Sequence, residues 1–152
     1  MNYWLMKSEP DAYSIDDLKR DKIEFWDGIR NYQARNMMRD GMQKGDLVFF
    51  YHSNTKPPGI VGVMQVCSTE AYPDHTQFNP ESKYYDPKSD PDKPRWLGVD
   101  MKYKKKFKRL ISLDELRQHP ELETMVTLRK GNRLSITPVE EKHWDIILKM
   151  AE

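Results

Sequence analysis

The sequence is poor in the residues that build disulfide networks and phosphate-binding loops. Its 152 residues include one cysteine, Cys67, and 7 glycines. One cysteine excludes an internal disulfide framework, and its apolar neighbours in IVGVMQVC favour a buried, unreactive thiol over a nucleophile. No GxGxxG or other Gly-rich phosphate motif is present. These absences indicate a protein of a reducing compartment without a nucleotide loop.

Long apolar runs and an excess of one charge sign are missing too. No stretch approaches the about 20 apolar residues that a membrane-spanning helix needs. The amino-terminal segment MNYWLMKSEP lacks the basic region and cleavage site of a signal peptide. The formal net charge is only +1, so any contact with nucleic acid must depend on local patches. We expect a soluble protein without a membrane partner, in the bacterial cytoplasm, or in the nucleus if the source is eukaryotic.

Metal and cofactor sites find no support in the sequence. The histidines are widely separated, and none forms an i, i+4 pair or joins a cysteine cluster. No serine lies in the glycine-flanked turn of a nucleophile elbow. We therefore predict no metal ion, no cofactor and no nucleophilic catalysis.

Size and periodicity indicate one mixed α/β domain over residues 1–152. A chain of this length buries a single core, to which its 4 tryptophans and 8 tyrosines contribute much of the packing. β-rich runs predict strands at 3–6, 23–26, 47–52, 60–66 and 99–109, with a further one near 133–136. Short helices fall between these runs. We expect a curved sheet or small barrel with peripheral helices.

Capping-box patterns mark three helix starts. In such a box a hydroxyl caps the helix and an acid three residues later reaches back. The pairs are Ser14 with Asp17, Ser112 with Glu115 and Thr137 with Glu140. Pro138, directly after the third cap, suits a first helical turn. We expect this last helix to close the domain, with Trp144 on its packed face.

One tryptophan stands in a polar turn instead of an apolar run. In FWDGIRN, Trp26 directly precedes Asp27 and Gly28. It is either a core residue that happens to precede a turn or a flat wall that faces a ligand, and we favour the wall. Trp4, in a strand apolar on both sides, is predicted to be core, and Trp96 fits either role.

The sequence resembles the EVE domain family in six segments: YWLMKSEP, WDGIRNYQARN, GDLVFFYHS, GIVGVMQV, KPRWLGVDMKYKKKF and KGNRLSITPV. The similarity extends from Tyr3 to about Trp144. It implies a PUA-like fold, a curved barrel-like sheet with short peripheral helices, related to YTH domains that read methylated bases. It also implies a non-catalytic module that binds DNA or RNA carrying a modified base, with 5-methylcytosine and 5-hydroxymethylcytosine the usual proposals.

The resemblance also implies a base-binding pocket. Trp26 would be its stacking wall, with Lys7 and Ser8 below it. The rim and the remaining sides would be Gly28, Ile29, Arg30, Asn31, Tyr51, His52, Ser53, Trp96, Asp100, Leu134 and Ser135.

Elementary energetics limits what such a pocket needs. Stacking on an indole contributes about 1–3 kcal/mol and hardly distinguishes one base from another. Selectivity must therefore come from polar groups at the base edge. The backbone around Gly28 and the short side chains of Ser8, Asn31, Ser53 and Ser135 suit that task, because they lose little rotamer entropy.

Cations for the flanking phosphates are available in two places. Arg30, Arg35 and Arg39 are expected on a helix after WDGI. The alternation from Val99 places Lys102, Lys104 and Lys106 on the exposed face of a strand. A basic strand face can contact phosphates, or it can serve solubility and protect a sheet edge.

Two other functions fit the same residues. One is an enzyme acting on a modified nucleobase or nucleotide, with Lys7, Glu9 or Asp27 as acid or base. The other is a general PUA-like RNA-binding module that uses the lysine strand and does not need Trp26. Nothing in the sequence indicates an oligomeric state.

Overall fold

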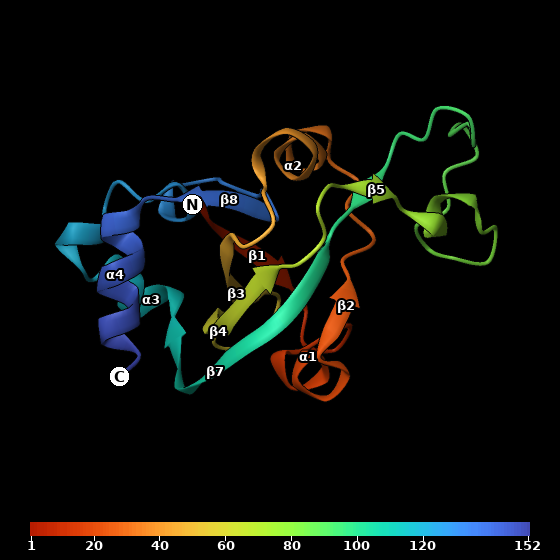
Figure 1. The fold of residues 1–152 in the computed structure, drawn as a ribbon. Coiled ribbons are helices and arrows are strands. Elements are labelled where there is room, and N and C mark those ends of the chain that lie inside the picture. The colour runs from red at the N-terminus through yellow and green to blue at the C-terminus, as the bar shows by residue number, and fades with distance from the viewer.

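The computed structural model describes all residues from Met1 to Glu152 and has a curled six-stranded sheet at its centre (Figure 1). The strand order is β2-β7-β4-β3-β1-β8. The strands are β1 (Tyr3–Ser8), β2 (Ile23–Phe25), β3 (Leu47–His52), β4 (Gly59–Val66), β7 (Asp100–Ser112) and β8 (Ile136–Val139). Only β1 and β3 run parallel, and the other neighbours are antiparallel. Two short strands, β5 (Tyr72–Pro73) and β6 (Leu97–Gly98), form a separate pair.

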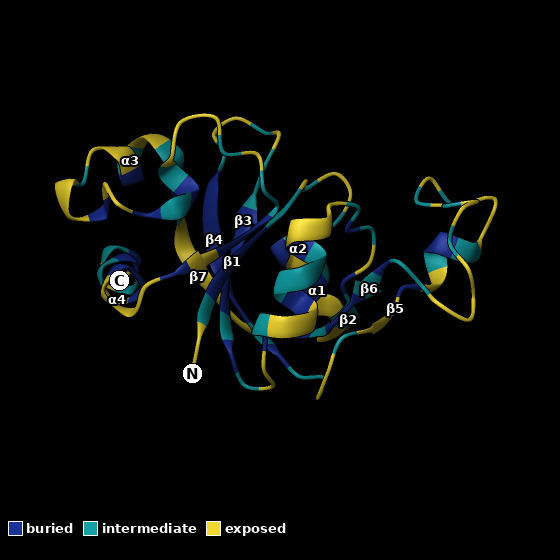
Figure 2. Cartoon of the chain, turned by 90° about the horizontal axis from the view of Figure 1, so that it is seen from above, coloured by how far each residue is buried: buried dark blue, intermediate teal, exposed yellow.

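Short helices cover both faces of the sheet. They are α1 (Ile15–Asp21), α2 (Tyr32–Asn36), which continues into a π-helical turn (Met37–Gly41), α3 (Leu113–Arg117) and α4 (Glu141–Met150). Single 3-10 turns lie at His75–Phe78, Pro120–Leu122 and Val126–Leu128. Figure 2 shows α1 and α2 on one side of the sheet and α3 and α4 on the other. None of the helices combines the length and apolar character that crossing a bilayer requires.

Two hydrophobic cores arise from the alternation of side chains along the central strands. Met6 and Phe50 pack with α1, α2 and Trp26 on one face. Leu5 and Phe49 pack with α3 and α4 on the other face. Because neighbouring residues of a strand point to opposite sides, the short apolar strand β1 contributes side chains to both cores. Residues on both faces of β1 are apolar, which explains why Trp4 is buried, as predicted.

The mixed α/β fold with a curved sheet is confirmed, and the five main strands lie where the apolar runs predicted them. The capping box of α1 is confirmed as well. The amide of Asp17 donates to Ser14 Oγ at 3.1 Å, and the amide of Ser14 donates to the Asp17 carboxylate at 2.8 Å. The second box is only half formed, because the Glu115 carboxylate accepts from Arg109 at 2.7 Å instead of reaching back to Ser112.

The prediction for the last helix start was wrong. Thr137 and Pro138 lie in β8, opposite Leu5 and Trp4 of β1, and α4 begins only at Glu141. The Thr137 hydroxyl bonds that of Thr127 at 2.7 Å instead of capping a helix. Proline is compatible with β8 because this strand is the edge of the sheet. The strand expected near 133–136 accordingly begins at Ile136.

The lysines of β7 do not form the single face that strict alternation predicted. Met64 pairs with Tyr103 and Val63 with Lys105, so Lys104 is an extra residue in a β-bulge. Lys102 then lies opposite Gln65, whereas Lys106 lies opposite Gly62. Because the bulge reverses the alternation, Lys102 and Lys106 point to opposite sides of the sheet.

Candidate functional site

A cavity of about 750 Å³ lies at the end of β1, between β2 with its following turn and the segment that precedes β8. The chain between β5 and β6 projects away from the sheet in Figure 1 and returns to line the cavity with Lys83 and Tyr84. The remaining lining comes from the end of β1 and the residues that follow it, from β2 and the turn after it, and from Ser53, Arg133 and Ser135.

Backbone hydrogen bonds at the end of β1 bring distant segments together. The amide of Ser53 donates to the Ser8 carbonyl at 3.0 Å. On the other side of the strand, the amide of Lys7 donates to the Ser135 carbonyl at 2.8 Å. Ser53 and Ser135 therefore flank the end of β1, and both line the cavity.

Trp26 belongs to the core and to the cavity wall at the same time. Its side chain is 7% exposed, and its ring makes T-shaped contacts with Phe50 at 5.4 Å and Tyr13 at 6.1 Å. No aromatic ring of the protein stacks flat on the indole. The interpretations as core residue and as wall are therefore not exclusive, because the ring is fixed by edge contacts while it lines the cavity.

The turn after Trp26 requires glycine for two reasons. Gly28 has φ +80°, and a Cβ atom there would lie 2.6 Å from the ring of Tyr84. A side chain would thus be strained and would displace the tyrosine from the cavity wall. The amide of Gly28 donates to the Asp74 carboxylate at 2.8 Å. It is not free to read a base edge, contrary to the expectation for this backbone.

Arg30 fastens the segment between β5 and β6 to this turn. Its Nε and Nη2 donate to the Tyr84 carbonyl at 3.0 and 2.8 Å, and Nη2 also donates to Thr76 at 3.0 Å. Its Nη1 donates to the Ile29 carbonyl and to Asp74, both at 3.0 Å. A guanidinium has five N–H donors, and all five are used inside the protein. Arg30 lines the cavity but has no donor left for a phosphate.

Asp74 is the buried counterpart of this arginine. Burial alone would raise the pKa of its carboxyl group, but hydrogen bonds from Thr76, the Gly28 amide and Arg30 hold the pKa below its ordinary value. The carboxylate therefore stays ionised and connects its own segment, through Thr76, with the turn that carries Gly28 and Arg30.

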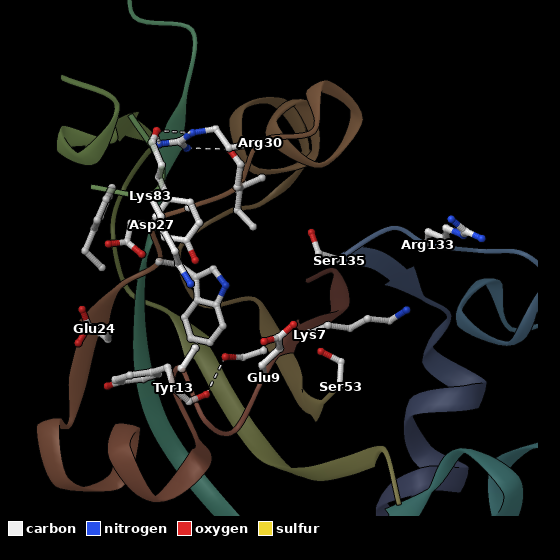
Figure 3. Close-up of a pocket in the computed structure, with 17 residues that line it drawn as sticks. Lys7, Glu9, Tyr13, Glu24, Asp27, Arg30, Ser53, Lys83, Arg133 and Ser135 are labelled. Carbon is white, nitrogen blue, oxygen red and sulfur yellow. Dashed lines mark hydrogen bonds between the residues drawn. The ribbon is translucent and has the colours of Figure 1, made fainter. Parts of the chain in front are cut away.

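The cavity has two chemically different ends (Figure 3). Glu24 and Asp27 lie on one side. Burial raises the pKa of both carboxyl groups, and the neighbouring Asp74 raises that of Asp27 further. The opposite side carries Lys7, Ser53, Ser135 and Arg133. Burial lowers the pKa of the Lys7 ammonium group.

The structure brings together several of the residues that the sequence predicts for the site. The predicted residues that line the cavity are Lys7, Ser8, Trp26, Gly28, Ile29, Arg30, Ser53 and Ser135. Of the hydroxyls among them, that of Ser8 donates to the Tyr13 carbonyl at 2.6 Å, whereas those of Ser53 and Ser135 form no hydrogen bond within the protein.

Other predicted site residues do not line the cavity, because their side chains have structural partners elsewhere. The side-chain oxygen of Asn31, Oδ1, caps α2 by accepting from the Ala34 amide at 3.0 Å. Tyr51 alternates into the core on the opposite face. Trp96 stacks on Tyr32 at 4.8 Å, and its indole donates to a carboxylate at 2.7 Å.

His52, Asp100 and Leu134 also lie outside the cavity. His52 Nε2 accepts from the amide of Ile15 at the start of α1, at 3.1 Å. Asp100 accepts a short hydrogen bond from the Tyr72 hydroxyl. Leu134 lies between two lining residues, Arg133 and Ser135, but does not line the cavity itself.

The other predicted phosphate contacts lie outside the cavity. Arg35 donates to the Arg95 carbonyl at 2.9 Å and stacks over a tyrosine ring, and Arg39 pairs with its neighbour Asp40. None of the β7 lysines lines the cavity, and Lys106 pairs with a carboxylate of α1 at 2.8 Å.

Several lining residues are not among those that the sequence predicts for the site. Glu9 and Asp27 were considered only as catalytic groups, and Arg133 is adjacent to a predicted residue. Tyr13, Glu24, Lys83 and Tyr84 are further lining residues that the sequence did not suggest. No local signal marks Lys83 or Tyr84, because the fold of a long segment brings them to the turn. No group of three or more His, Cys, Asp or Glu side chains is arranged to hold a metal ion.

Comparisons with known proteins place this chain among well-defined relatives. Residues 2–150 match the model of the EVE domain family. Thymocyte nuclear protein 1 of Mus musculus is 45% identical over 170 residues, which cover 99% of this chain and 74% of that protein. A crystal structure of a Pseudomonas syringae protein superposes with a TM-score of 0.94 at 45% identity and covers 99% of each chain. Human THYN1 protein in complex with 5-methylcytosine-containing DNA superposes with a TM-score of 0.93 at 42% identity, covering 100% of this chain and 98% of that one.

Proposed function

The chain belongs to the EVE domain family, and from this premise we propose that it is a non-catalytic module that takes a modified cytosine of a nucleic acid into the cavity beside Trp26. One observation carries the proposal. A cavity of about 750 Å³ with an indole in its wall lies in a chain 42% identical to a protein crystallised with 5-methylcytosine-containing DNA. Cavities that hold small ligands typically have volumes of this order.

Stacking alone does not suffice for this function. Extruding a base from a duplex costs a few kcal/mol, and stacking on an indole returns about 1–3 kcal/mol. Hydrogen bonds to the base edge must supply the rest. The carboxylates of Glu24 and Asp27, which line the cavity beside Trp26, are the groups placed to do so.

A carboxylate is the group that can separate 5-methylcytosine from thymine. Both bases carry a methyl group at C5, so an apolar surface cannot tell them apart. They differ at C4, where cytosine has an amine that donates and thymine a carbonyl that accepts. Asp27 lines the cavity and accepts no hydrogen bond from another residue. We propose that it accepts from the cytosine amine.

One observation supports a second candidate function. Lys7, Glu9 and Asp27 line the same cavity, as an enzyme acting on a modified nucleobase would require. Incubation of the protein with 5-methylcytosine-containing DNA, followed by nucleoside analysis, distinguishes the two candidates. The binding module returns the base unchanged, and the enzyme releases or converts it.

Binding to matched oligonucleotides tests the main proposal. Strands that differ only in one base (cytosine, 5-methylcytosine, 5-hydroxymethylcytosine or thymine) are compared as DNA and RNA, single-stranded and duplex. A modified cytosine is expected to bind more tightly than the other bases. Equal affinity for all four would refute the proposal. Loss of binding on substitution of Lys102 and Lys104, with no effect of a Trp26 substitution, would favour the general RNA-binding module instead.

A further inference from the structure

The end of the cavity opposite Glu24 and Asp27 gathers more hydrogen-bond donors than acceptors. Lys7, Ser53, Ser135 and Arg133 line this end (Figure 3). The Lys7 ammonium lies 5.6 Å from the centre of the Tyr51 ring and forms no ion pair. Arg133 forms no ion pair and no side-chain hydrogen bond either. The hydroxyls of Ser53 and Ser135 complete a set of side chains that can all donate outward.

The backbone holds these donors close together. The amide of Ser53 donates to the carbonyl of Ser8, and the amide of Lys7 donates to the carbonyl of Ser135. Adjacent extended segments in a sheet lie about 4.8 Å apart, so the two serines stand one segment on either side of the lysine. Two hydroxyls and an ammonium group therefore come from three adjacent segments that line the same cavity.

A partly buried ammonium group without a counter-ion carries an electrostatic cost. Burial lowers the pKa of Lys7, which shows that its surroundings disfavour the charge. A second cation at the same end adds repulsion. An anion bound between them would relieve both costs, and an oxyanion would also accept from the two hydroxyls.

We propose that Lys7, Arg133, Ser53 and Ser135 form a subsite for one phosphodiester group, the one that flanks the base taken up beside Trp26. This assignment rests on the proposed function, because it takes a nucleic acid as the ligand. It differs from the sequence prediction, which assigned the phosphates to Arg30, Arg35, Arg39 and the β7 lysines. Arg30 has no free donor, and the other cations lie outside the cavity.

One carboxylate opposes the anion. Glu9 lines the cavity next to Ser8, and its carboxylate accepts only a long hydrogen bond from Asn54, at 3.3 Å. Its charge reduces the affinity for a phosphate at this end. Glu9→Gln is therefore expected to strengthen binding, and this direction is one that general damage to the fold would not produce.

The test replaces single phosphates instead of whole nucleotides. An oligonucleotide with one 5-methylcytosine is prepared with a neutral methylphosphonate at the linkage 5′ of that nucleotide, at the linkage 3′ of it, or at a linkage three nucleotides away. Its affinity is measured for the wild type, Lys7→Gln and Glu9→Gln. A charged hydrogen bond predicts that one adjacent neutral linkage weakens wild-type binding about 10-fold to about 100-fold, while the distant linkage has little effect.

The variant decides whether this phosphate is bound by the proposed subsite. In Lys7→Gln, the same neutral linkage is expected to weaken binding far less than in the wild type, because the ammonium group that binds this phosphate is already absent. Equal losses in wild type and variant, or no loss at either adjacent linkage, would overturn the subsite. Failure of the wild type to prefer 5-methylcytosine, with the coupling to Lys7 intact, would instead refute the proposed function and leave the phosphate subsite standing. No binding to any oligonucleotide would refute both.

Discussion

Replacing Trp26 by leucine tests the indole wall, because it removes the flat ring and keeps an apolar side chain in the core. The loss of base stacking is worth about 1–3 kcal/mol, which corresponds to an affinity about 5-fold to about 150-fold weaker for DNA with 5-methylcytosine. The core contributes a second effect. The side chain is only 7% exposed and contacts Phe50 and Tyr13, so we expect the free energy of unfolding to fall by about 2–3 kcal/mol.

Two measurements separate these effects. Urea denaturation gives the loss of stability, and calorimetric titration under folding conditions gives the affinity of the folded protein. Trp144→Leu is the matched control, since this tryptophan is 2% exposed and stacks on Phe49 at 3.8 Å in the core of the opposite face. The control is expected to lose comparable stability and to keep wild-type affinity.

Two results would refute the reasoning. A folded Trp26→Leu protein that binds within twofold of the wild type would show that no base stacks on the indole. An equal loss of affinity in Trp144→Leu would show that affinity only follows stability. In the first case the enzyme and RNA-binding alternatives, neither of which requires stacking, would gain support.

Three further predictions concern the groups around this wall. Asp27→Asn is expected to reduce the ratio of affinities for 5-methylcytosine and thymine by about 10-fold, because the amide can donate to thymine, and an unchanged ratio in competition binding would exclude Asp27 as the reader of the amine. Arg30→Lys is expected to lower the free energy of unfolding by about 2–3 kcal/mol, because the ammonium group of lysine cannot form all five hydrogen bonds that the guanidinium donates. Arg39→Lys, which alters only an exposed pair with a neighbouring aspartate, should change it by less than about 0.5 kcal/mol in the same urea titration, and equal losses would contradict this account. Asp74, whose pKa lies below its model-peptide value of 3.8, stabilises the native state above that pH, and this contribution is lost as the pH falls from about 3.8 through the native pKa. Urea titrations between pH 7 and 3 should therefore show that the free energy of unfolding falls more steeply with acid in the wild type than in Asp74→Asn, and equal pH dependence in the two proteins would argue against this role of Asp74.

Local pattern was a reliable guide where near neighbours decide the structure. The apolar runs specified the five main strands, and the hydroxyl of Ser14 with the acid three residues later specified the start of α1. Trp4 was correctly placed in the core because its whole strand is apolar. Resemblance in several segments also indicated the family, which the match over residues 2–150 shows.

The same kind of pattern failed where a distant partner changed its meaning. Thr137 and Pro138 look like a helix start, but pairing with β1 makes them an edge strand. The alternation of lysines from Lys102 is regular in the sequence, but a bulge opposite β4 divides it between two faces. Neither the pairing nor the bulge leaves a trace in the local sequence, because both depend on which strand lies alongside.

The sequence by itself determined the strands, the turn at Gly28 and the position of Trp26 beside it, since these depend on backbone preferences and on residues a few places away. Only the tertiary structure decided which polar groups are free. Arg30 has all its donors taken by residues 44 to 54 positions away or by its own turn, whereas Ser53 and Ser135 flank the end of β1 with their hydroxyls unused. The residue type fixes how many hydrogen bonds a side chain can form. Whether its donors and acceptors are already used depends on neighbours that folding brings from far along the chain.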